Sequence, residues 1–239
     1  WRLSSRINKT SDEFSLELSN FFTSNDIDKT KINELSLCSV VPTLTDTIVV
    51  SLKSLTNQEP LIVGPGTRTG IQINYDRTQD VGADRIANAV AVNHIYGNPA
   101  IVIDMGTATV FDVMIKGPKY IGGAIAPGIQ VSAEAIARET SQLPKVELVA
   151  PPSVIGKNTI ESIQSGFVYG FVHMIEGMTK RIKTKIHKNE RDLVKVIATG
   201  GLAHIITPHT NIFYDVNKDL TLHGLRIIKD INQKDNAVK

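Results

Sequence analysis

Apolar and polar residues follow one another along the chain in a pattern that predicts strands and helices in succession. In the first third, apolar positions at helical spacing predict an amphipathic helix from Ser11 to about Asn25 and another that opens at Pro42. Runs of β-branched and aliphatic residues at 35–41 and 61–63 predict a strand on each side of the second helix. A strand, a helix and a strand in this order favour an α/β fold with parallel pairing.

The middle of the chain continues this alternation. Segment 71–75 alternates as a strand does, and the apolar positions of 81–97 predict a helix that a glycine ends. Two apolar runs, 101–103 and 110–113, enclose a short polar turn and therefore predict a strand hairpin. A third strand is expected at 120–125, where paired glycines allow another backbone to approach closely.

The C-terminal half is expected to add one buried strand and several helices. The strand is expected at 194–199, and the helices at 128–136, at about 161–186, from 202 onward and at 220–231. Three glycines on the long helix, at positions 166, 170 and 177, indicate that it packs tightly, within the chain or against a twin subunit. Its basic end carries no interleaved aromatic residues, which favours a solvated surface over a nucleic-acid site.

Composition limits the class of protein. The 239 residues are 41% hydrophobic and 21% charged, which is ordinary for a globular protein of one large or two modest domains. A net charge of +2 gives no field that would predict nucleic-acid binding. No stretch approaches the roughly 20 apolar residues that span a bilayer, so no membrane segment is expected. Cys38 is the single cysteine, which excludes a disulfide framework and makes a reducing cytoplasm the simplest setting.

The polar turn inside the predicted hairpin carries the strongest candidate chemistry. It reads DMGTAT and contains Asp104, Gly106, Thr107 and Thr109. Turn amides and hydroxyls donate to phosphate oxygens, and a carboxylate can hold the accompanying cation. The alternative is an ordinary Asp-x-Gly hairpin turn, and the motif alone leaves both interpretations open.

A second candidate is Asp84, which falls in the first turn of the helix predicted at 81–97. The positive end of the helix dipole favours an ionised carboxylate there. Acids are common in first turns, so a purely structural role is one interpretation. The other is that Asp84, beside Arg85 at a strand-to-helix loop, accepts a proton from a substrate.

Several familiar motifs are excluded. The segment GPGTRTG at 64–70 has one residue too many for a dinucleotide-binding loop, and no helix is predicted directly after it. The Gly-Lys pair at 156–157 lacks the preceding glycine of a Walker A loop. The six histidines are scattered and form no metal-ligand pair, so no zinc site is expected.

Weak signals nevertheless occur in a specific order. They are Tyr75, GADR at 82–85, DMGTAT at 104–109, GGAIAPG at 122–128, IGKNT at 155–159 and ATGG at 198–201. In this combination the chain resembles the type III pantothenate kinase family, some of whose members are called Bvg accessory factors. The likeness extends from WRLSS at the start to LTLHGL at 220–225.

The resemblance implies a fold and a reaction. The family is similar to the actin, Hsp70 and sugar-kinase superfamily, so the implied fold is α/β with two ribonuclease-H-like domains and an ATP cleft between them. The domains are expected at 1–97 and 98–239, the second with a dimerisation helix. The implied activity is ATP-dependent phosphorylation of pantothenate to 4'-phosphopantothenate, the first step of coenzyme A biosynthesis. The implied setting is a cytoplasmic homodimer with no nucleic-acid or membrane partner.

The resemblance also implies the substrate residues. Asp84 matches the general base that takes the proton from the primary hydroxyl of pantothenate. Gly82, Ala83 and Arg85 match the loop that binds this substrate, where the guanidinium can pair with its carboxylate. Further substrate contacts correspond to Tyr75 and Thr159, the latter from a partner subunit.

For ATP and its ions, the resemblance implies residues of two loops. Asp104 matches the ligand of a monovalent cation, K⁺ or NH₄⁺, and Mg²⁺ would accompany the nucleotide. Gly106 and Thr107 match contacts to the ATP phosphates, and Gly200 and Gly201 match a motif on the adenosine side.

One departure from the family pattern leaves an alternative open. Family members carry a first phosphate loop, D-x-G-N-T, some two dozen residues before the Trp-Arg element, and here Trp1 is the first residue. The loop is expected in a segment upstream of this sequence. If it were absent, the chain would be a catalytically impaired accessory or regulatory protein of the same fold. A third candidate is a kinase or phosphatase of the same superfamily that acts on a sugar or polyphosphate.

Overall fold

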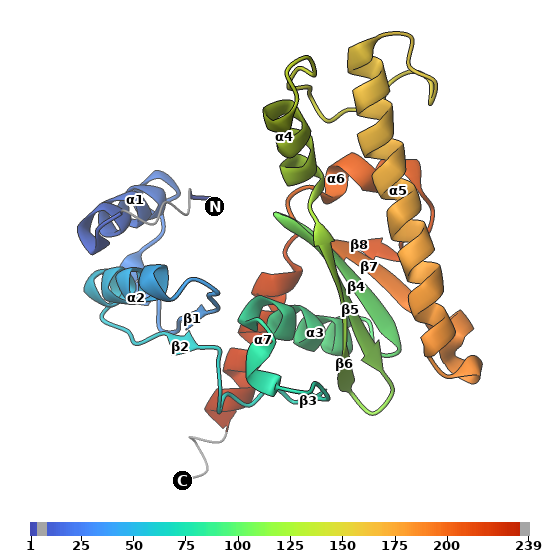
Figure 1. Cartoon of the computed structure of the whole chain (residues 1–239). Coiled ribbons are helices and arrows are strands. Elements are labelled where there is room, and N and C mark those ends of the chain that lie inside the picture. The colour runs from blue at the N-terminus through green and yellow to red at the C-terminus, as the bar shows by residue number, and fades with distance from the viewer. Residues whose placement is uncertain (4–8, 235–239) are drawn as a thin grey trace. The chain divides into compact units, whose positions relative to one another are not determined.

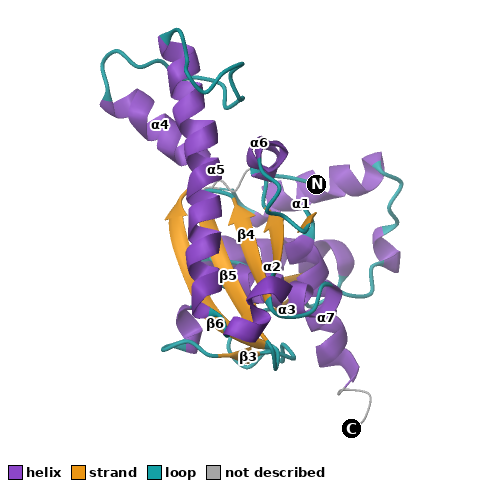
Figure 2. Cartoon of the chain, turned by 90° about the vertical axis from the view of Figure 1, so that its right-hand side faces the viewer, coloured by secondary structure: helices purple, strands orange, loops and turns teal. Residues whose placement is uncertain are grey.

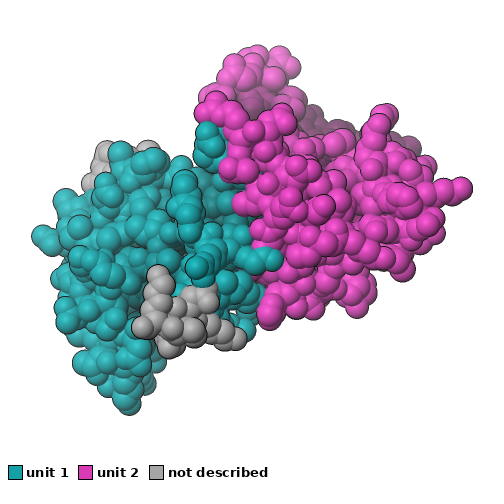
Figure 3. Space-filling view, turned by 90° about the horizontal axis from the view of Figure 1, so that it is seen from below, with its two compact units in different colours: residues 1–70, 79–87, 221–239 teal, residues 71–78, 88–220 magenta. Residues whose placement is uncertain are grey.

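The protein is described by a computed structural model that covers residues 1–3 and 9–234, and the chain forms two compact units. The first contains residues 1–70 and 79–87 together with the C-terminal helix from residue 221 onward. The second contains residues 71–78 and 88–220, and Figure 3 colours the two units separately. The expected domains, 1–97 and 98–239, stay a prediction. Each compact unit is built from separate segments of the chain, and the C-terminal helix belongs to the same unit as the N-terminal segment.

The first unit contains two helices that begin where the sequence predicts. Helix α1 spans Ser11–Ser24 and α2 spans Pro42–Thr56. A capping box opens α1: the Thr10 hydroxyl accepts from the backbone N–H of Glu13, and the Thr10 N–H donates to the Glu13 carboxylate at 2.7 Å. A proline suits the first turn of α2, because its missing N–H would have had no helical partner.

Two short strands and the C-terminal helix complete the first unit. Strands β1 (Ser36–Leu37) and β2 (Leu61–Ile62) pair in parallel, which confirms the predicted pairing. Each is only two residues long, shorter than the predicted runs. Helix α7 (Leu220–Lys234) packs closely through Gly224, where a Cβ would lie 2.0 Å from the carbonyl oxygen of Ala87.

A six-stranded sheet forms the centre of the second unit (Figure 1). Its order is β3-β6-β5-β4-β7-β8, and the strands are β3 (Gln72–Ile73), β4 (Ala100–Met105), β5 (Ala108–Ile115), β6 (Lys119–Pro127), β7 (Lys195–Thr199) and β8 (Asp215–Val216). Strands β4, β5 and β6 form an antiparallel meander, which confirms the predicted hairpin and third strand. Strand β7 is parallel to β4, and β8 is parallel to β7. From β6 to β8 these are the order and directions of a ribonuclease-H-like domain.

The core of the second unit lies between this sheet and helix α5 (Thr159–Lys185). Ile101, Ile103 and Phe111 on the sheet are fully buried and belong to the same hydrophobic cluster as Ile175 of α5. Successive side chains of a strand point to opposite faces, so alternate residues of β4 meet this helix. Figure 2 shows α5 lying across the face of the sheet.

The remaining helices are α3 (Ala83–Ile95), α4 (Ile129–Glu139) and α6 (Ala203–Ile206), with short 3₁₀ turns at Lys29–Lys31, Thr78–Asp80, Lys188–Leu193 and Thr207–His209. The sequence predicts a helix that continues from residue 202, but α6 has only four residues. Pro208 lies in the 3₁₀ turn that follows it, and proline cannot donate the backbone bond that would continue the α-helix.

The three glycines of α5 do not pack against another part of the described chain, and packing against a twin subunit stays a prediction. A Cβ at Gly166, Gly170 or Gly177 would meet no atom within 4 Å. The prediction of tight packing within the chain is therefore wrong, and these positions lie on an open surface. Among residues 1–3 and 9–234, no helix is both long and apolar enough to cross a membrane.

Candidate functional site

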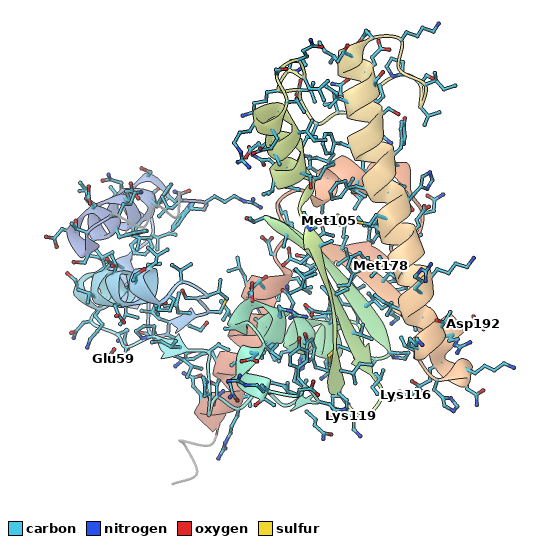
Figure 4. The ribbon with its side chains drawn as sticks, viewed as in Figure 1. Glu59, Met105, Lys116, Lys119, Met178 and Asp192 are labelled. Carbon is cyan, nitrogen blue, oxygen red and sulfur yellow. The ribbon has the colours of Figure 1, made fainter. Side chains whose placement is uncertain are left out.

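Asp104 lies at the end of β4, where two parallel strands bring separate loops together. Asp104 is in register with Thr199 at the end of β7. Because the carboxyl ends of parallel strands meet at one edge of a sheet, the β4–β5 turn lies beside the Gly200–Gly201 loop that follows β7. Figure 4 labels Met105 at this edge and Lys116 and Lys119 at the opposite end of the meander.

Gly200 fits against this turn more closely than any other residue type could. Its φ is +93°, and a Cβ would lie 2.5 Å from Asp104 Oδ1 and 2.5 Å from both the nitrogen and the oxygen of Met105. The Leu202 N–H donates to the Met105 carbonyl at 2.9 Å and ties the two loops together. The structure thus brings three predicted site residues, Asp104, Gly200 and Gly201, into one cluster.

The turn itself is held in shape by backbone bonds. Gly106 N donates to the Ala108 carbonyl at 3.0 Å, and Gly128 N donates to the Thr107 carbonyl at 3.0 Å. A Cβ at Gly128 would overlap both turn carbonyls, at 2.3 Å from Gly106 O and 2.5 Å from Thr107 O. The Thr107 residue remains exposed. A fixed turn with an exposed hydroxyl is suited to donate to a phosphate group.

Asn88 belongs to this cluster, although the sequence did not single it out. Its side chain is 1% exposed, and its Nδ2 donates to Asp104 Oδ2 at 3.1 Å. The signal that could have found it is an amide between alanines on the apolar face of α3, four residues after Asp84. A buried amide of this kind needs a hydrogen-bond partner.

A cavity adjoins the Gly200–Gly201 loop. It has a volume of about 610 Å³ and is lined by α4, α6 and residues 145–150. Apolar walls come from residues such as Leu148 and Ile205, and polar groups from residues such as Gln130 and His204. The His204 ring lies 3.0 Å from the Gly201 carbonyl and links the cavity to this loop. An apolar pocket with a few polar groups is typical of small-molecule sites.

Within the first unit, Asp84 and its neighbours form a second cluster. Asp84 lies in the first turn of α3, half-buried, and its Oδ1 accepts from the Arg85 N–H at 2.8 Å. A Cβ at Gly82 would lie 2.5 Å from this oxygen, so the glycine leaves room for the carboxylate. Burial and, second, the negative charge of Asp84 raise the pKa of the half-buried Cys38 thiol to about 11. In the GADR loop, α3 thus begins at Ala83, and the absence of a side chain at Gly82 leaves space for the Asp84 carboxylate.

The other two predicted substrate residues lie apart from one another in the second unit. Tyr75 is 39% exposed and packs over Gly122, where a Cβ would lie 3.1 Å from its ring. Beside it, the fully buried Tyr120 hydroxyl donates to Asp112 Oδ1 at 2.8 Å. Thr159 is the exposed first residue of α5, directly after the Asn158 cap.

The donors near Asp104 suit a cation that is shared with a nucleotide. Among the described residues, no group of three or more His, Cys, Asp or Glu side chains is placed to hold a metal ion. A single carboxylate beside turn carbonyls is still sufficient for Mg²⁺ in nucleotide sites, because phosphate oxygens and waters supply its other ligands. These oxygen donors also fit a hard monovalent cation, so the residues present fit the implied ions.

The order and directions of the sheet are those of a ribonuclease-H-like fold, and an acid, a hydroxyl-bearing turn and a glycine loop meet at one of its edges. The family model for type III pantothenate kinase matches residues 1–181, and the chain belongs to this family. It is therefore a kinase, that is, a phosphotransferase.

Curated relatives carry the likeness over nearly the whole chain. The type III pantothenate kinase of Dehalococcoides mccartyi is 44% identical over 98% of this chain and 89% of its own length. That of Moorella thermoacetica is 43% identical over 97% of this chain and 90% of its own. Among solved structures, a conserved putative Baf family transcriptional activator from Campylobacter jejuni has a TM-score of 0.57 at 21% identity, covering 91% of this chain and 89% of its own. At that identity it shows a shared fold.

Proposed function

We propose that this chain transfers the terminal phosphoryl group of ATP to the primary hydroxyl of pantothenate, giving 4'-phosphopantothenate and ADP. This would be the first step of coenzyme A biosynthesis. The observation that carries the proposal is the cluster of Asp104, the Gly106–Thr107 turn and the Gly200–Gly201 loop at one sheet edge. In a chain of this family, such a cluster is suited to bind the phosphates of ATP.

In this proposal, the second unit binds ATP. The Thr107 hydroxyl donates to a phosphate oxygen, and Gly106, which has no side chain, lets the phosphate approach the turn. The cavity beside Gly201 receives the nucleoside, for which its volume of about 610 Å³ and its apolar walls are suitable. Asp104 binds a monovalent cation, K⁺ or NH₄⁺. Bound cations, including the Mg²⁺ that accompanies ATP, supply neutralisation of the charge on the transferring phosphoryl group.

Asp84 is the proposed general base. It takes the proton from the primary hydroxyl of pantothenate as that oxygen forms a bond to the γ-phosphorus. The bond between the γ-phosphorus and the bridging oxygen breaks, and ADP leaves with the electron pair. Arg85, next to Gly82 and Ala83 in the same loop, would pair with the carboxylate of pantothenate, and Tyr75 would contact the rest of the molecule.

We also propose that the protein acts as a cytoplasmic homodimer. Several large apolar residues of the second unit are exposed on α4, on the segment that follows it and at the start of α5: Val131, Ile136, Val149, Val154, Ile155 and Ile160. Apolar residues gathered on one part of a surface favour a protein interface. The open glycines of α5 would allow a second backbone to approach, and Thr159, exposed in this region, would serve the partner's substrate.

The alternative activities have less support. The curated relatives described above are named as kinases, which speaks against a catalytically impaired accessory protein. The presence of Asp84 and Arg85 in one loop, and of Asp104 and Thr107 in the other, supports a working enzyme. A sugar or polyphosphate acceptor has no specific feature in its favour.

The test is ADP release by the purified full-length protein with ATP and Mg²⁺, with and without pantothenate, in K⁺ and in Na⁺. We expect ADP release that depends on pantothenate and is faster in K⁺. ADP release with a sugar but not with pantothenate would identify another acceptor. A folded protein that releases no ADP with any acceptor would favour the accessory role.

A further inference from the structure

Asn88 is a buried polar side chain in an otherwise apolar stretch of α3. Its exposed fraction is 1%, and the flanking Ala87, Ala89 and Val90 are exposed by no more than 2%. Burying an amide without a partner costs on the order of 1–3 kcal/mol, so an apolar residue would be the simpler choice for stability alone. The position of Asn88 therefore calls for a role beyond packing.

The hydrogen bond from Asn88 gives the two carboxylate oxygens of Asp104 different surroundings. Asn88 Nδ2 donates to Oδ2 at 3.1 Å. The other oxygen, Oδ1, faces the two glycine-containing loops. A Cβ at Gly200 would lie 2.5 Å from Oδ1, and a Cβ at Gly106 would lie 3.8 Å from it. The bond thus selects one orientation of a carboxylate that is itself only half-buried.

The donor is neutral, and this matters for a cation ligand. A lysine or arginine at position 88 would also hold the carboxylate, but its positive charge would offset the negative charge that attracts a cation. An amide donates the same hydrogen bond and leaves the charge of Asp104 in place. Groups that hydrogen-bond a metal ligand in this way fix its direction, and their loss typically weakens metal binding by about 10–100 fold.

We propose that Asn88 is a positioning residue that orients the Asp104 carboxylate for a monovalent cation. This inference rests on the proposed function only in taking Asp104 as the cation ligand. Asn88 itself touches neither substrate nor nucleotide in this account. It acts through Asp104.

The test measures K⁺ binding without relying on turnover. The midpoint of thermal unfolding is followed in the presence of ADP and Mg²⁺ while KCl replaces choline chloride at constant ionic strength. Stabilisation by a ligand depends on its concentration relative to its dissociation constant, so the KCl titration reports affinity. We expect Asn88→Ala to require about 10–100 fold more KCl than the unaltered protein for the same stabilisation.

Asn93 provides a matched control on the same helix. Its side-chain oxygen accepts from Asn98 Nδ2 at 2.6 Å, and it has no bond to Asp104 among those described. Asn93→Ala should lower the unfolding temperature and leave the KCl requirement unchanged. If Asn88→Ala does not fold, Asn88→Ser can replace it. Serine keeps a polar group that is too short to reach Asp104, so this variant should show the same increase in the KCl requirement.

The results separate this inference from the proposed function. An equal KCl requirement in Asn88→Ala and Asn93→Ala would overturn the positioning role, even with full pantothenate kinase activity. A protein that KCl does not stabilise at all would overturn it as well. An increased KCl requirement in Asn88→Ala alone would support it, whatever acceptor the kinase uses. In kinetic assays at saturating K⁺, the KM for pantothenate should then stay within about threefold of its original value, because only the cation site is altered.

Discussion

Replacing Gly200 with alanine tests the close approach of the two loops that form the proposed phosphate site. The added methyl group would meet Asp104 Oδ1 and the backbone nitrogen and oxygen of Met105, each at 2.5 Å. The two Met105 atoms belong to the backbone and cannot move away cheaply, so a turn of the Asp104 side chain alone would not relieve the overlap. The φ of +93° adds strain, because an L-residue with a Cβ rarely adopts it.

The two effects can be given magnitudes. Left-handed backbone geometry costs about 1–2 kcal/mol for a residue with a Cβ. Overpacking against neighbours that move little costs about 1–3 kcal/mol more. Gly200→Ala should therefore lower the free energy of unfolding by about 2–5 kcal/mol, or the unfolding temperature by roughly 4–20 °C for a domain of this size.

Two glycines of the same unit serve as controls in urea and thermal unfolding. Gly97 has φ +77° and no atom within 4 Å of its Cβ position, so Gly97→Ala isolates the backbone cost of about 1–2 kcal/mol. Gly117 has φ +84°, and the only atom near its Cβ position is the flexible end of Lys119 at 3.7 Å, so Gly117→Ala should likewise cost only about 1–2 kcal/mol. If Gly200→Ala destabilises the protein no more than Gly97→Ala does, the loops do not approach as described.

Further predictions concern Asp84, Cys38 and Tyr120. Asp84→Asn should fold normally and lower the rate of phosphoryl transfer by at least about 10² fold, and near-normal turnover would remove it as the base. The pKa of Cys38, raised to about 11, should make alkylation by iodoacetamide slow at pH 8, and Asp84→Asn should lower that pKa and speed the reaction. As pH rises, the Cys38 thiol ionises in the unfolded chain before it ionises in the folded protein. The contribution of Cys38 to the free energy of unfolding is therefore present below about pH 9 and is lost as pH rises through about 11. Urea unfolding at several pH values can measure this loss. Tyr120→Phe leaves a fully buried Asp112 without its hydroxyl donor and should cost about 1–3 kcal/mol in urea unfolding, whereas no loss would contradict the bond.

Local signals in the sequence were sufficient for most elements. The apolar period and Pro42 located the first two helices, and the two apolar runs around DMGTAT located the β4–β5 hairpin. Strand lengths were harder to predict: β1, β2 and β3 have two residues each, because the length of a strand depends on the partner beside it and not on its own composition.

Tertiary contacts explain what the sequence did not reveal about the site. The hydrogen bond from Asn88 joins residues 16 positions apart, and it exists because α3 packs near the end of β4. Gly200 was selected for its motif, but the reason for a glycine there is the space that Asp104 and Met105 occupy. The glycines of α5 were expected to pack within the chain or against a twin subunit, and they do not pack within the chain, since glycine spacing alone does not identify the neighbour.

The most direct test of the proposed kinase activity follows the phosphoryl group itself. The protein is incubated with ATP labelled at the γ-phosphate, with Mg²⁺, K⁺ and pantothenate, and the products are separated. We expect the label to appear in 4'-phosphopantothenate in step with ADP formation. Label that stays in ATP, or is released only as inorganic phosphate, would contradict it.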